Sequence, residues 1–325
     1  MAQQRPGNSA RLPLQSRHQL RLSWEDGDAP AWKITYQVLV GTVRKPRALL
    51  IAGVHGDEYE SVAALQDVAR EINPRQLRGT LTIVPVANPY AFFAGTRRTP
   101  VDAGDLNRAF PGDPQGPLTE RWADLIFRNL VLGSDAVLSM HGWSKEATVV
   151  PYVEYPAEPT RVGKKSAALA RALGVEFLHP YEWPAGLLVA AAIRHGIPAV
   201  ESEVGGGGLI TPEGQRSCRN IIYGFLHKLR MLDPGPSPSH TPISSSQVVG
   251  HSDCRADHPG LFRNRVALGE TVGKGDLLGA VYDVAGECVQ EVHSPRLGTV
   301  AILRTFAVVH PGDLLARLFW PLKNT

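Results

Sequence analysis

The sequence contains few cysteines, little net charge and no long apolar run. Its 325 residues include three cysteines, which are widely spaced: Cys218, Cys254 and Cys288. An odd, sparse set without a Cys-x-x-Cys pair argues against a disulfide scaffold and indicates free thiols in a reducing cytoplasm. The formal charge of +3 is small and scattered, so we expect no nucleic-acid partner and no membrane-surface partner. Without a membrane-length apolar run or a signal-peptide core, we also expect neither a transmembrane helix nor a secretion signal.

Apolar residues make up 43% of the chain, enough for a substantial core and two domains. Strand-like and helix-like stretches alternate up to about residue 232, which favours an α/β sheet with helices on its faces. We assign residues 1–30 to a flexible N-terminal segment and 31–232 to this α/β domain. The expected strands are 34–40, 48–52, 80–86, 136–140 and 198–203, and the expected helices are 61–72, 119–130, 164–173 and 213–232.

A break in composition follows at residues 233–246, where four prolines alternate with glycine and a triple serine, as in an extended linker. Beyond it, residues 247–325 show short strands and tight turns without a clear helix. Gly275-Asp276-Leu277-Leu278 recurs as Gly312-Asp313-Leu314-Leu315. We therefore expect a small all-β barrel or sandwich with a pseudo-symmetric pair of hairpins.

One run carries most of the chemical information: Leu50-Ile51-Ala52-Gly53-Val54-His55-Gly56-Asp57-Glu58. A short apolar strand ends in glycine, and a histidine and a glutamate follow three residues apart. A helical turn would bring His55 and Glu58 to one side, where an imidazole and a carboxylate can bind one metal ion. The alternative is a solvated helix start whose acidic residues complement the helix dipole, and the pair alone does not exclude it.

Three further segments carry polar residues in a loop or at the end of an expected strand. They are Asp105-Leu106-Asn107-Arg108-Ala109-Phe110-Pro111-Gly112, Ala136-Val137-Leu138-Ser139-Met140-His141-Gly142 and Ile197-Pro198-Ala199-Val200-Glu201-Ser202-Glu203-Val204-Gly205-Gly206. Ligands in α/β sheets bind beyond the carboxyl ends of the strands, so we expect His55, His141 and Glu203 to gather there.

Together, the H-x-x-E, D-L-N-R-x-F-P-G and I-P-A-V-x-x-E-x-G-G patterns resemble the succinylglutamate desuccinylase and aspartoacylase family, a branch of the zinc carboxypeptidase clan. The resemblance covers roughly residues 45–325. It implies a zinc-carboxypeptidase-like mixed sheet flanked by helices, which makes 31–232 the zinc-dependent catalytic domain, followed by a small lipoyl-like barrel as an accessory domain. It also implies one Zn²⁺ per chain, held by His55, Glu58 and His141, and amide hydrolysis by attack of a zinc-bound water.

The resemblance further implies that Glu203 is the general base. Glu201 lies on the same face of the strand, so periodicity alone leaves both open, and the family pattern selects Glu203. The family usually has an aspartate two residues before the third zinc ligand, where this chain has Ser139. That departure bears on the activity more than on the metal.

Two arginine positions complete the implied site. Arg97 would polarise the scissile carbonyl and stabilise the oxyanion, with Arg98 as its rival for that role. Asn107 and Arg108 would bind a carboxylate of the substrate, because a guanidinium makes a planar, bidentate contact with that group.

These features predict a cytoplasmic zinc-dependent deacylase that acts on a small N-acylated amino acid or a close analogue. Its two-domain layout is closest to the N-acetyl-diaminobutyrate deacetylase-like branch of the family. One alternative is a metallocarboxypeptidase for short peptides, which the same metal and Asn-Arg pair would serve. A non-catalytic relative that binds a metal or a ligand is an alternative from another class. The acyl group, the amino-acid side chain and the oligomeric state stay open, with a homo-oligomer among the alternatives.

Overall fold

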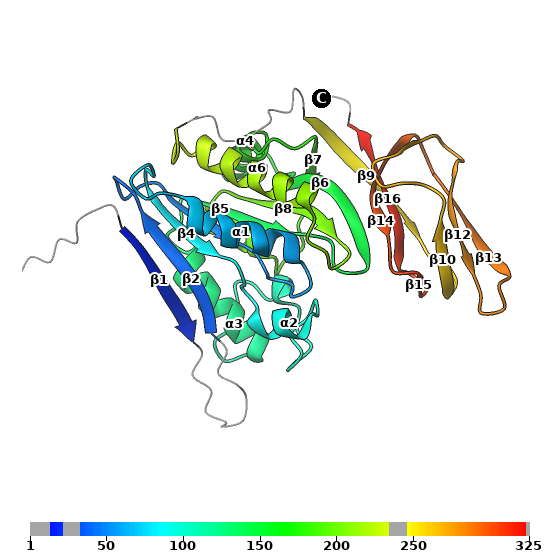
Figure 1. Ribbon diagram of the computed structural model, residues 1–325, viewed down its shortest axis with the longest axis horizontal. Helices are drawn as coiled ribbons and strands as arrows, with labels where there is room; N and C mark the ends of the chain where they lie inside the picture. The colour runs from blue at the N-terminus through cyan, green and yellow to red at the C-terminus, as the bar shows by residue number, and fades with distance from the viewer. Residues whose placement is uncertain (1–13, 22–32, 234–245, 323–325) are drawn as a thin grey trace, which may run out of the picture.

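The structure is a computed structural model that describes residues 14–21, 33–233 and 246–322, and a mixed sheet of twelve strands runs through this part of the chain (Figure 1). At its centre β3 pairs in parallel with β4 and β5, and β5 pairs in parallel with β8, whereas β6 is antiparallel to β8. In sheet order the strands are β1 (Leu14–Arg21), β2 (Lys33–Val40), β4 (Thr80–Val84), β3 (Arg47–Ile51), β5 (Ala136–His141), β8 (Ala199–Gly206), β6 (Ala147–Pro156), β7 (Phe177–Tyr181), β9 (Gln247–Arg255), β16 (Leu314–Pro321), β14 (Gly298–Arg304) and β11 (Thr271–Val272).

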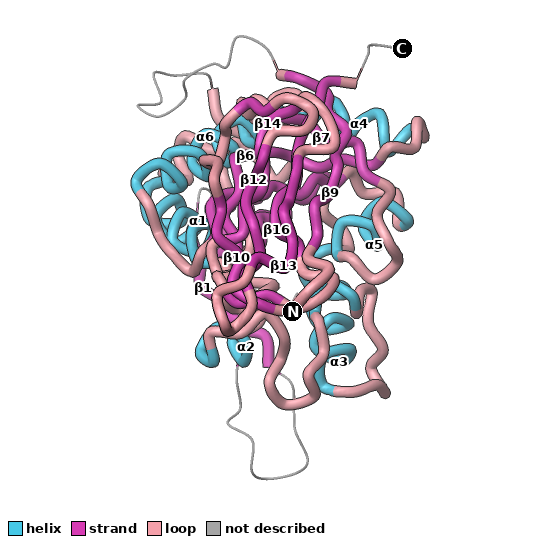
Figure 2. Tube along the Cα trace, turned by 90° about the vertical axis from the view of Figure 1, so that its right-hand side faces the viewer, coloured by secondary structure: helices cyan, strands magenta, loops and turns pink. Residues whose placement is uncertain are grey.

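Helices cover both faces of the first half of the sheet (Figures 1 and 2). One face carries α1 (Tyr59–Glu71), α4 (Arg161–Ala170) and α6 (Pro212–Lys228), and the other carries α3 (Leu118–Ile126), its π-helical extension η2 (Phe127–Val131) and α5 (Leu188–Arg194). Two shorter helices, α2 (Pro89–Ala94) and η1 (Leu106–Arg108), lie in the connections. Side chains of β3 alternate between the two apolar clusters on either face of the sheet. Ala48 and Leu50 pack under α1 and α6, and Leu49 and Ile51 pack toward α3 and α5. Burial on both sides explains why this strand is apolar throughout its middle.

The expected α/β fold with a C-terminal all-β region is confirmed, with local corrections. Leu14–Arg21 forms strand β1 along β2, although we expected it within a flexible segment. The strand was missed because Leu14 and Leu20 are its only aliphatic residues. The expected helix 119–130 ends as a regular α-helix at Ile126 and continues as a π-helix. Residues 1–13 and 22–30 of the expected flexible segment, and 234–245 of the expected linker, lie outside the described residues.

Within residues 246–322 the regular elements are all strands. A four-stranded sheet of β13 (Cys288–His293), β12 (Leu277–Tyr282), β10 (Gly260–Asn264) and β15 (Val308–Val309) packs against β9, β16, β14 and β11 around a shared apolar cluster. The repeated Gly-Asp-Leu-Leu segments make the same turn: Asp276 Oδ2 accepts from the backbone N–H of Gly273, and Asp313 Oδ2 accepts from that of His310. Each aspartate thus closes the turn that leads into β12 or β16.

The two halves of the chain share both hydrogen bonds and a core. β7 pairs in parallel with β9, and β14 pairs antiparallel with β6. An apolar cluster that includes Val149, Tyr152 and Phe177 from the first half and Ile302 and Phe319 from the second lies at this junction. The strands β9, β16, β14 and β11 therefore continue the same sheet that carries the helices. Among the helices of the described residues, none has both the length and the apolar character needed to cross a membrane.

Candidate metal site and substrate pocket

The site lies at the carboxyl ends of β3, β5 and β8, as the strand-end positions predicted. The chain leaves β3 through Gly53, whose φ of +61° and approach to the Pro85 carbonyl leave no room for a side chain. Glu58 then takes the N-cap position of α1 but makes no side-chain cap bond, and it is only 4% exposed. The solvated helix start is therefore not what this segment forms, because the Glu58 carboxylate faces inward instead.

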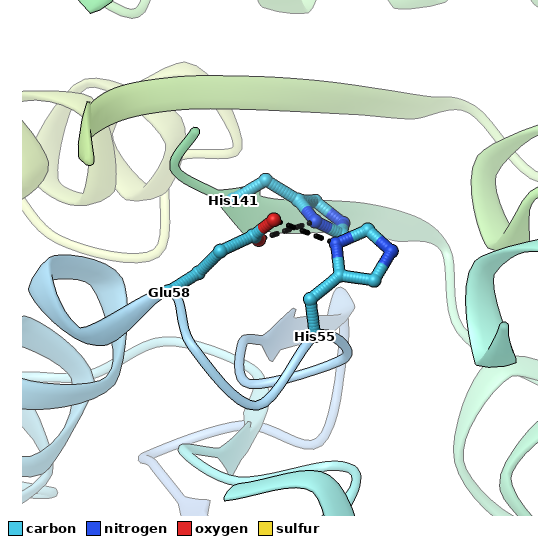
Figure 3. Close-up of side chains that lie close together, drawn as sticks. All are labelled: His55, Glu58 and His141. Carbon is cyan, nitrogen blue, oxygen red and sulfur yellow. Dashed lines mark hydrogen bonds and ion pairs between the residues drawn. The ribbon is translucent and has the colours of Figure 1, made fainter. Parts of the chain in front are cut away.

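His55, Glu58 and His141 come together as a buried group (Figure 3). Nδ1 of His55 lies 2.7 Å from Oε1 of Glu58, and Nδ1 of His141 lies 3.0 Å from Oε2 of the same carboxylate. One ligand atom from each residue lies within 4.8 Å of the other two, so all three can contact one ion. Two imidazoles and a carboxylate are a donor set found in catalytic zinc sites, and these residues fit a zinc ion.

The Nε2 atom of each imidazole also has polar neighbours. Nε2 of His55 lies 3.2 Å from Oδ1 of Asp105, and Nε2 of His141 lies 2.9 Å from Oγ of Ser139 and 3.4 Å from Oε2 of Glu201. Contacts of this kind fix the orientation of a ligating histidine. Asp105 also accepts from the backbone N–H of Asn107, which braces the loop.

The carboxylates set the charge of the group. Burial alone would lower the pKa of His141, but Glu201 and Glu58 raise that pKa to about 10. Burial would raise the pKa of Glu58, but His55 and His141 hold it well below its usual value. The pKa of Asp105 is likewise depressed, chiefly by His55, although burial opposes the shift. These shifts favour the charged imidazolium of His141 and the ionised carboxylates of Glu58 and Asp105.

Glu203 lies beside the group on β8, in register with His141 on β5 and with Tyr152 on β6. Its Oε2 has no hydrogen-bond partner among the described residues. Burial raises its pKa well above the usual value; His141 opposes this shift, and Glu58 adds to it. A carboxyl group with a raised pKa and a free oxygen is suited to take up and release a proton.

The predicted arginines differ in position. The Arg97 guanidinium lies over the group, with Nη1 3.6 Å from Glu58 Oε1 and Nε 3.4 Å from Asp105 Oδ2. Arg98 is exposed and donates from Nη1 to the carbonyl of Ala103, 3.1 Å away. Of the two, Arg97 is the residue that the fold brings to the group of His55, Glu58 and His141.

Asn107 and Arg108 both line the cavity above the group. Arg108 is exposed there, with Nη1 donating to the carbonyl of Asn107. Asn107 is buried: Nδ2 donates to Glu201 Oε2 at 3.4 Å, and Oδ1 accepts from the backbone N–H of Leu188 at 3.0 Å. The two neighbours in sequence therefore differ: Arg108 is exposed to the cavity, whereas the Asn107 amide lines it but is buried and hydrogen-bonded to the protein.

The cavity has a volume of about 410 Å³ and draws its wall from both halves of the chain. The C-terminal region contributes Arg304 from β14, Leu314 and Arg317 from β16, and Asp313 from the turn before β16. Arg317 is fixed by Asp253 on the neighbouring strand, with Nε 2.7 Å from Oδ1, and its guanidinium lies 5.6 Å from the ring centre of Trp143. Sequence reasoning missed this wall, because nothing local marks these residues as neighbours of a site more than a hundred residues earlier.

A second buried polar cluster adjoins the cavity and was also missed. Glu154 Oε1 lies 3.1 Å from Nδ1 of His179, and Glu154 Oε2 accepts from Nε1 of Trp183. Nε2 of His179 in turn lies 2.9 Å from Nδ1 of His251 on β9. The signal available in the sequence was His179-Pro180-Tyr181-Glu182-Trp183, a polar and aromatic strand end, but its partner Glu154 had no motif around it.

Comparisons with known proteins agree with this geometry. A family model described as the succinylglutamate desuccinylase/aspartoacylase catalytic domain matches residues 44–229. N-alpha-acetyl-L-2,4-diaminobutyric acid deacetylase of Halomonas elongata is 35% identical over 283 residues, which cover 83% of this chain and 81% of that protein.

Solved structures are similar over nearly the whole chain. The product-bound structure of the ectoine utilization protein EutE (DoeB) from Ruegeria pomeroyi has a TM-score of 0.86 and 28% identity, covering 94% of this chain and 95% of its own. A succinylglutamate desuccinylase from a Silicibacter species has a TM-score of 0.87 and 28% identity, covering 95% of each chain.

Proposed function

The chain belongs to the succinylglutamate desuccinylase/aspartoacylase family of amide-bond hydrolases, and we propose that it is a zinc-dependent deacylase of an N-acylated amino acid or a close analogue. The observation that carries the proposal is the buried group of His55, Glu58 and His141 with the unpartnered oxygen of Glu203 beside it. The name of the Halomonas relative supports N-acetylated 2,4-diaminobutyrate as the first substrate to test.

In this proposal His55, Glu58 and His141 hold one zinc ion per chain. When bound, the ion would supply Lewis acidity that polarises a carbonyl and lowers the pKa of water. Glu203 accepts a proton from the attacking water at Oε2 and later donates it to the leaving amine nitrogen. The Arg97 guanidinium, which faces the same group, stabilises the negative charge that develops on the carbonyl oxygen.

Arg108 is the proposed contact for a carboxylate of the substrate. It is exposed to the cavity, and a guanidinium binds a carboxylate through two parallel hydrogen bonds. Asn107 is the proposed second contact. Its amide carries two hydrogens, of which Glu201 takes one, so one remains for the substrate.

The shape of the cavity favours the deacylase over the peptidase alternative. A volume of about 410 Å³ suits a small molecule, and strands from the C-terminal region wall it on one side. A carboxypeptidase would need an open groove for the rest of its peptide. We therefore propose that the C-terminal strands restrict the substrate to a small molecule.

We further propose the domain boundary at residues 233–246, where the helical part ends and the C-terminal strands begin. A cytoplasmic location is proposed as well, and the free thiols of Cys218, Cys254 and Cys288 support it.

The test is an activity comparison on the full chain loaded with Zn²⁺. We expect release of acetate from Nα-acetyl-2,4-diaminobutyrate and no release of C-terminal residues from short unmodified peptides. Peptide cleavage without deacylation would favour the carboxypeptidase, and the absence of both activities in the zinc-loaded protein would favour the non-catalytic relative.

A further inference from the structure

His141 is contacted on both ring nitrogens, and its outer nitrogen has two neighbours of different character. Nδ1 faces Glu58, whereas Nε2 lies 2.9 Å from the hydroxyl of Ser139 and 3.4 Å from a carboxylate oxygen of Glu201. Ser139 and Glu201 are register partners on the parallel strands β5 and β8, so both project from the same face of the sheet. The sheet thus places a carboxylate beside the imidazole from the neighbouring strand.

Glu201 is held in this place by the protein. It is 4% exposed, and its Oε2 accepts from Nδ2 of Asn107, whose Oδ1 accepts from the backbone N–H of Leu188 at the start of α5. The next carboxylate along the strand, Glu203, has an oxygen without a partner among the described residues and lines the cavity. The two glutamates share a strand face but differ in their contacts: Asn107 holds the Glu201 carboxylate, whereas Oε2 of Glu203 has no partner among the described residues.

The second imidazole of the group shows the same arrangement. His55 presents Nδ1 to Glu58, and its Nε2 lies 3.2 Å from the carboxylate of Asp105. Each histidine therefore has Glu58 on the inner side and a separate carboxylate on the outer side. A hydroxyl such as that of Ser139 can donate or accept, whereas an ionised carboxylate only accepts, so only a carboxylate fixes the proton on Nε2 and leaves the Nδ1 lone pair for a metal.

We propose that Glu201 is a positioning residue for His141: from the neighbouring strand it accepts the Nε2–H, orients the ring and strengthens Nδ1 as a zinc ligand. Asn107 positions Glu201 in turn. The inference rests on the metal site proposed above and adds that the affinity of the site for zinc depends on a residue that does not touch the ion.

The experiment measures zinc affinity of the full-length apoprotein by competition with a chromophoric chelator, with Zn²⁺ as the only added ligand. Glu201→Gln preserves the shape of the side chain and removes its charge, and we expect the affinity to fall by about 10- to 100-fold. Glu154→Gln is the matched control: Glu154 is a buried carboxylate in register with Glu201 on β6, but its oxygens face Trp183 and His179. We expect this variant to bind zinc like the wild type.

A rescue separates positioning from a general structural role. Since Ser139 already lies at Nε2 of His141, an aspartate there can supply the missing charge from the same strand. We expect the S139D/E201Q protein to recover most of the zinc affinity and the visible absorption of the wild-type Co²⁺ complex, and S139N/E201Q to recover neither. This pair of double variants decides the question even if E201Q alone does not fold, and circular dichroism checks that both are folded.

Wild-type zinc affinity in E201Q, or equal affinity in the two double variants, would overturn the inference and leave the proposed function standing. A wild-type protein that binds no zinc would overturn the inference and the proposed metal site together, and His55→Ala gives the benchmark for a destroyed site.

Discussion

Glu203 and His141 are register partners on adjacent parallel strands, β8 and β5, and both project to the face of the sheet that carries the cavity. Neither residue lies near the other in the sequence. The pairing places the proposed base beside a proposed metal ligand on the next strand. The strand register, rather than the conformation of a loop, therefore sets their separation.

Removal of the metal ligands should abolish zinc binding. We expect His55→Ala and His141→Ala to lose bound zinc and activity, because each removes one of three proposed protein ligands. Elemental analysis of the purified variants measures the metal content. His179→Gln is the control, since His179 is buried like the ligands but contacts Glu154 and His251 instead. Full zinc occupancy and activity in both alanine variants would show that the assignment is wrong.

Glu203→Gln should retain zinc and lower kcat by a factor of about 10² or more, because an amide cannot take up the proton of the attacking water. The measurement is steady-state deacylation with zinc content determined on the same samples. At saturating zinc, Glu201→Gln should lower kcat less, since Glu201 acts through His141. The reverse order of the two effects would exchange the roles of the glutamates.

Substrate recognition by Arg108 should depend on the shape of its side chain as well as its charge. Arg108→Lys keeps the charge but loses the planar pair of donors, so we expect a higher KM for substrates that carry a free carboxylate. Kinetics on the matching methyl ester provide the control, because wild type and variant should then perform alike. Equal turnover of acid and ester by the wild type would argue against a carboxylate contact.

The ion pair of Asp253 and Arg317 should contribute to stability in a pH-dependent way. Burial would raise the pKa of Asp253, but the hydrogen bonds and charge of Arg317 hold it below its usual value of 3.8. The contribution is therefore fully present above about pH 4 and is lost as the pH falls through the lower, folded-state pKa. We expect Asp253→Asn to cost about 2 kcal/mol of unfolding free energy at pH 7.

Urea unfolding as a function of pH measures this effect. The difference in unfolding free energy between wild type and Asp253→Asn should be constant from pH 7 to about pH 5 and should shrink toward pH 3. Asp276→Asn is the comparison, because Asp276 lies in an exposed turn and has no arginine partner in the described part of the chain. A difference that stays constant down to pH 3 would mean that the charge of Asp253 is not what stabilises the fold.

Local patterns were sufficient to predict the elements that carry the site. His55 and Glu58 follow a buried strand at helical spacing, His141 ends the apolar strand β5, and Glu203 lies in β8 just before its glycines. Strand β1 was not predicted, because its sequence is largely polar and it gains stability by pairing with β2 at the edge of the sheet. Pairing of this kind is a tertiary effect that no local pattern records.

The contacts around the ligands could not be predicted for a related reason. That Glu201 meets His141 depends on β5 lying beside β8, and that Glu154 lies beside Glu201 depends on the insertion of β6 as an antiparallel neighbour. The wall formed by Arg317 depends further on β14 pairing with β6, over a separation of more than a hundred residues. Strand order, rather than residue type, was the missing information.

The proposed catalytic groups and one wall of the cavity come from different parts of the chain. The groups proposed to carry out hydrolysis all lie before residue 207, whereas Arg317 and its C-terminal neighbours in the cavity wall lie between residues 255 and 317. Substitutions in β14 or β16 can reshape what fits the cavity while the proposed metal ligands and the proposed base stay as they are. In evolution or in the laboratory, new substrate preferences can therefore arise from a region that takes no part in breaking the bond.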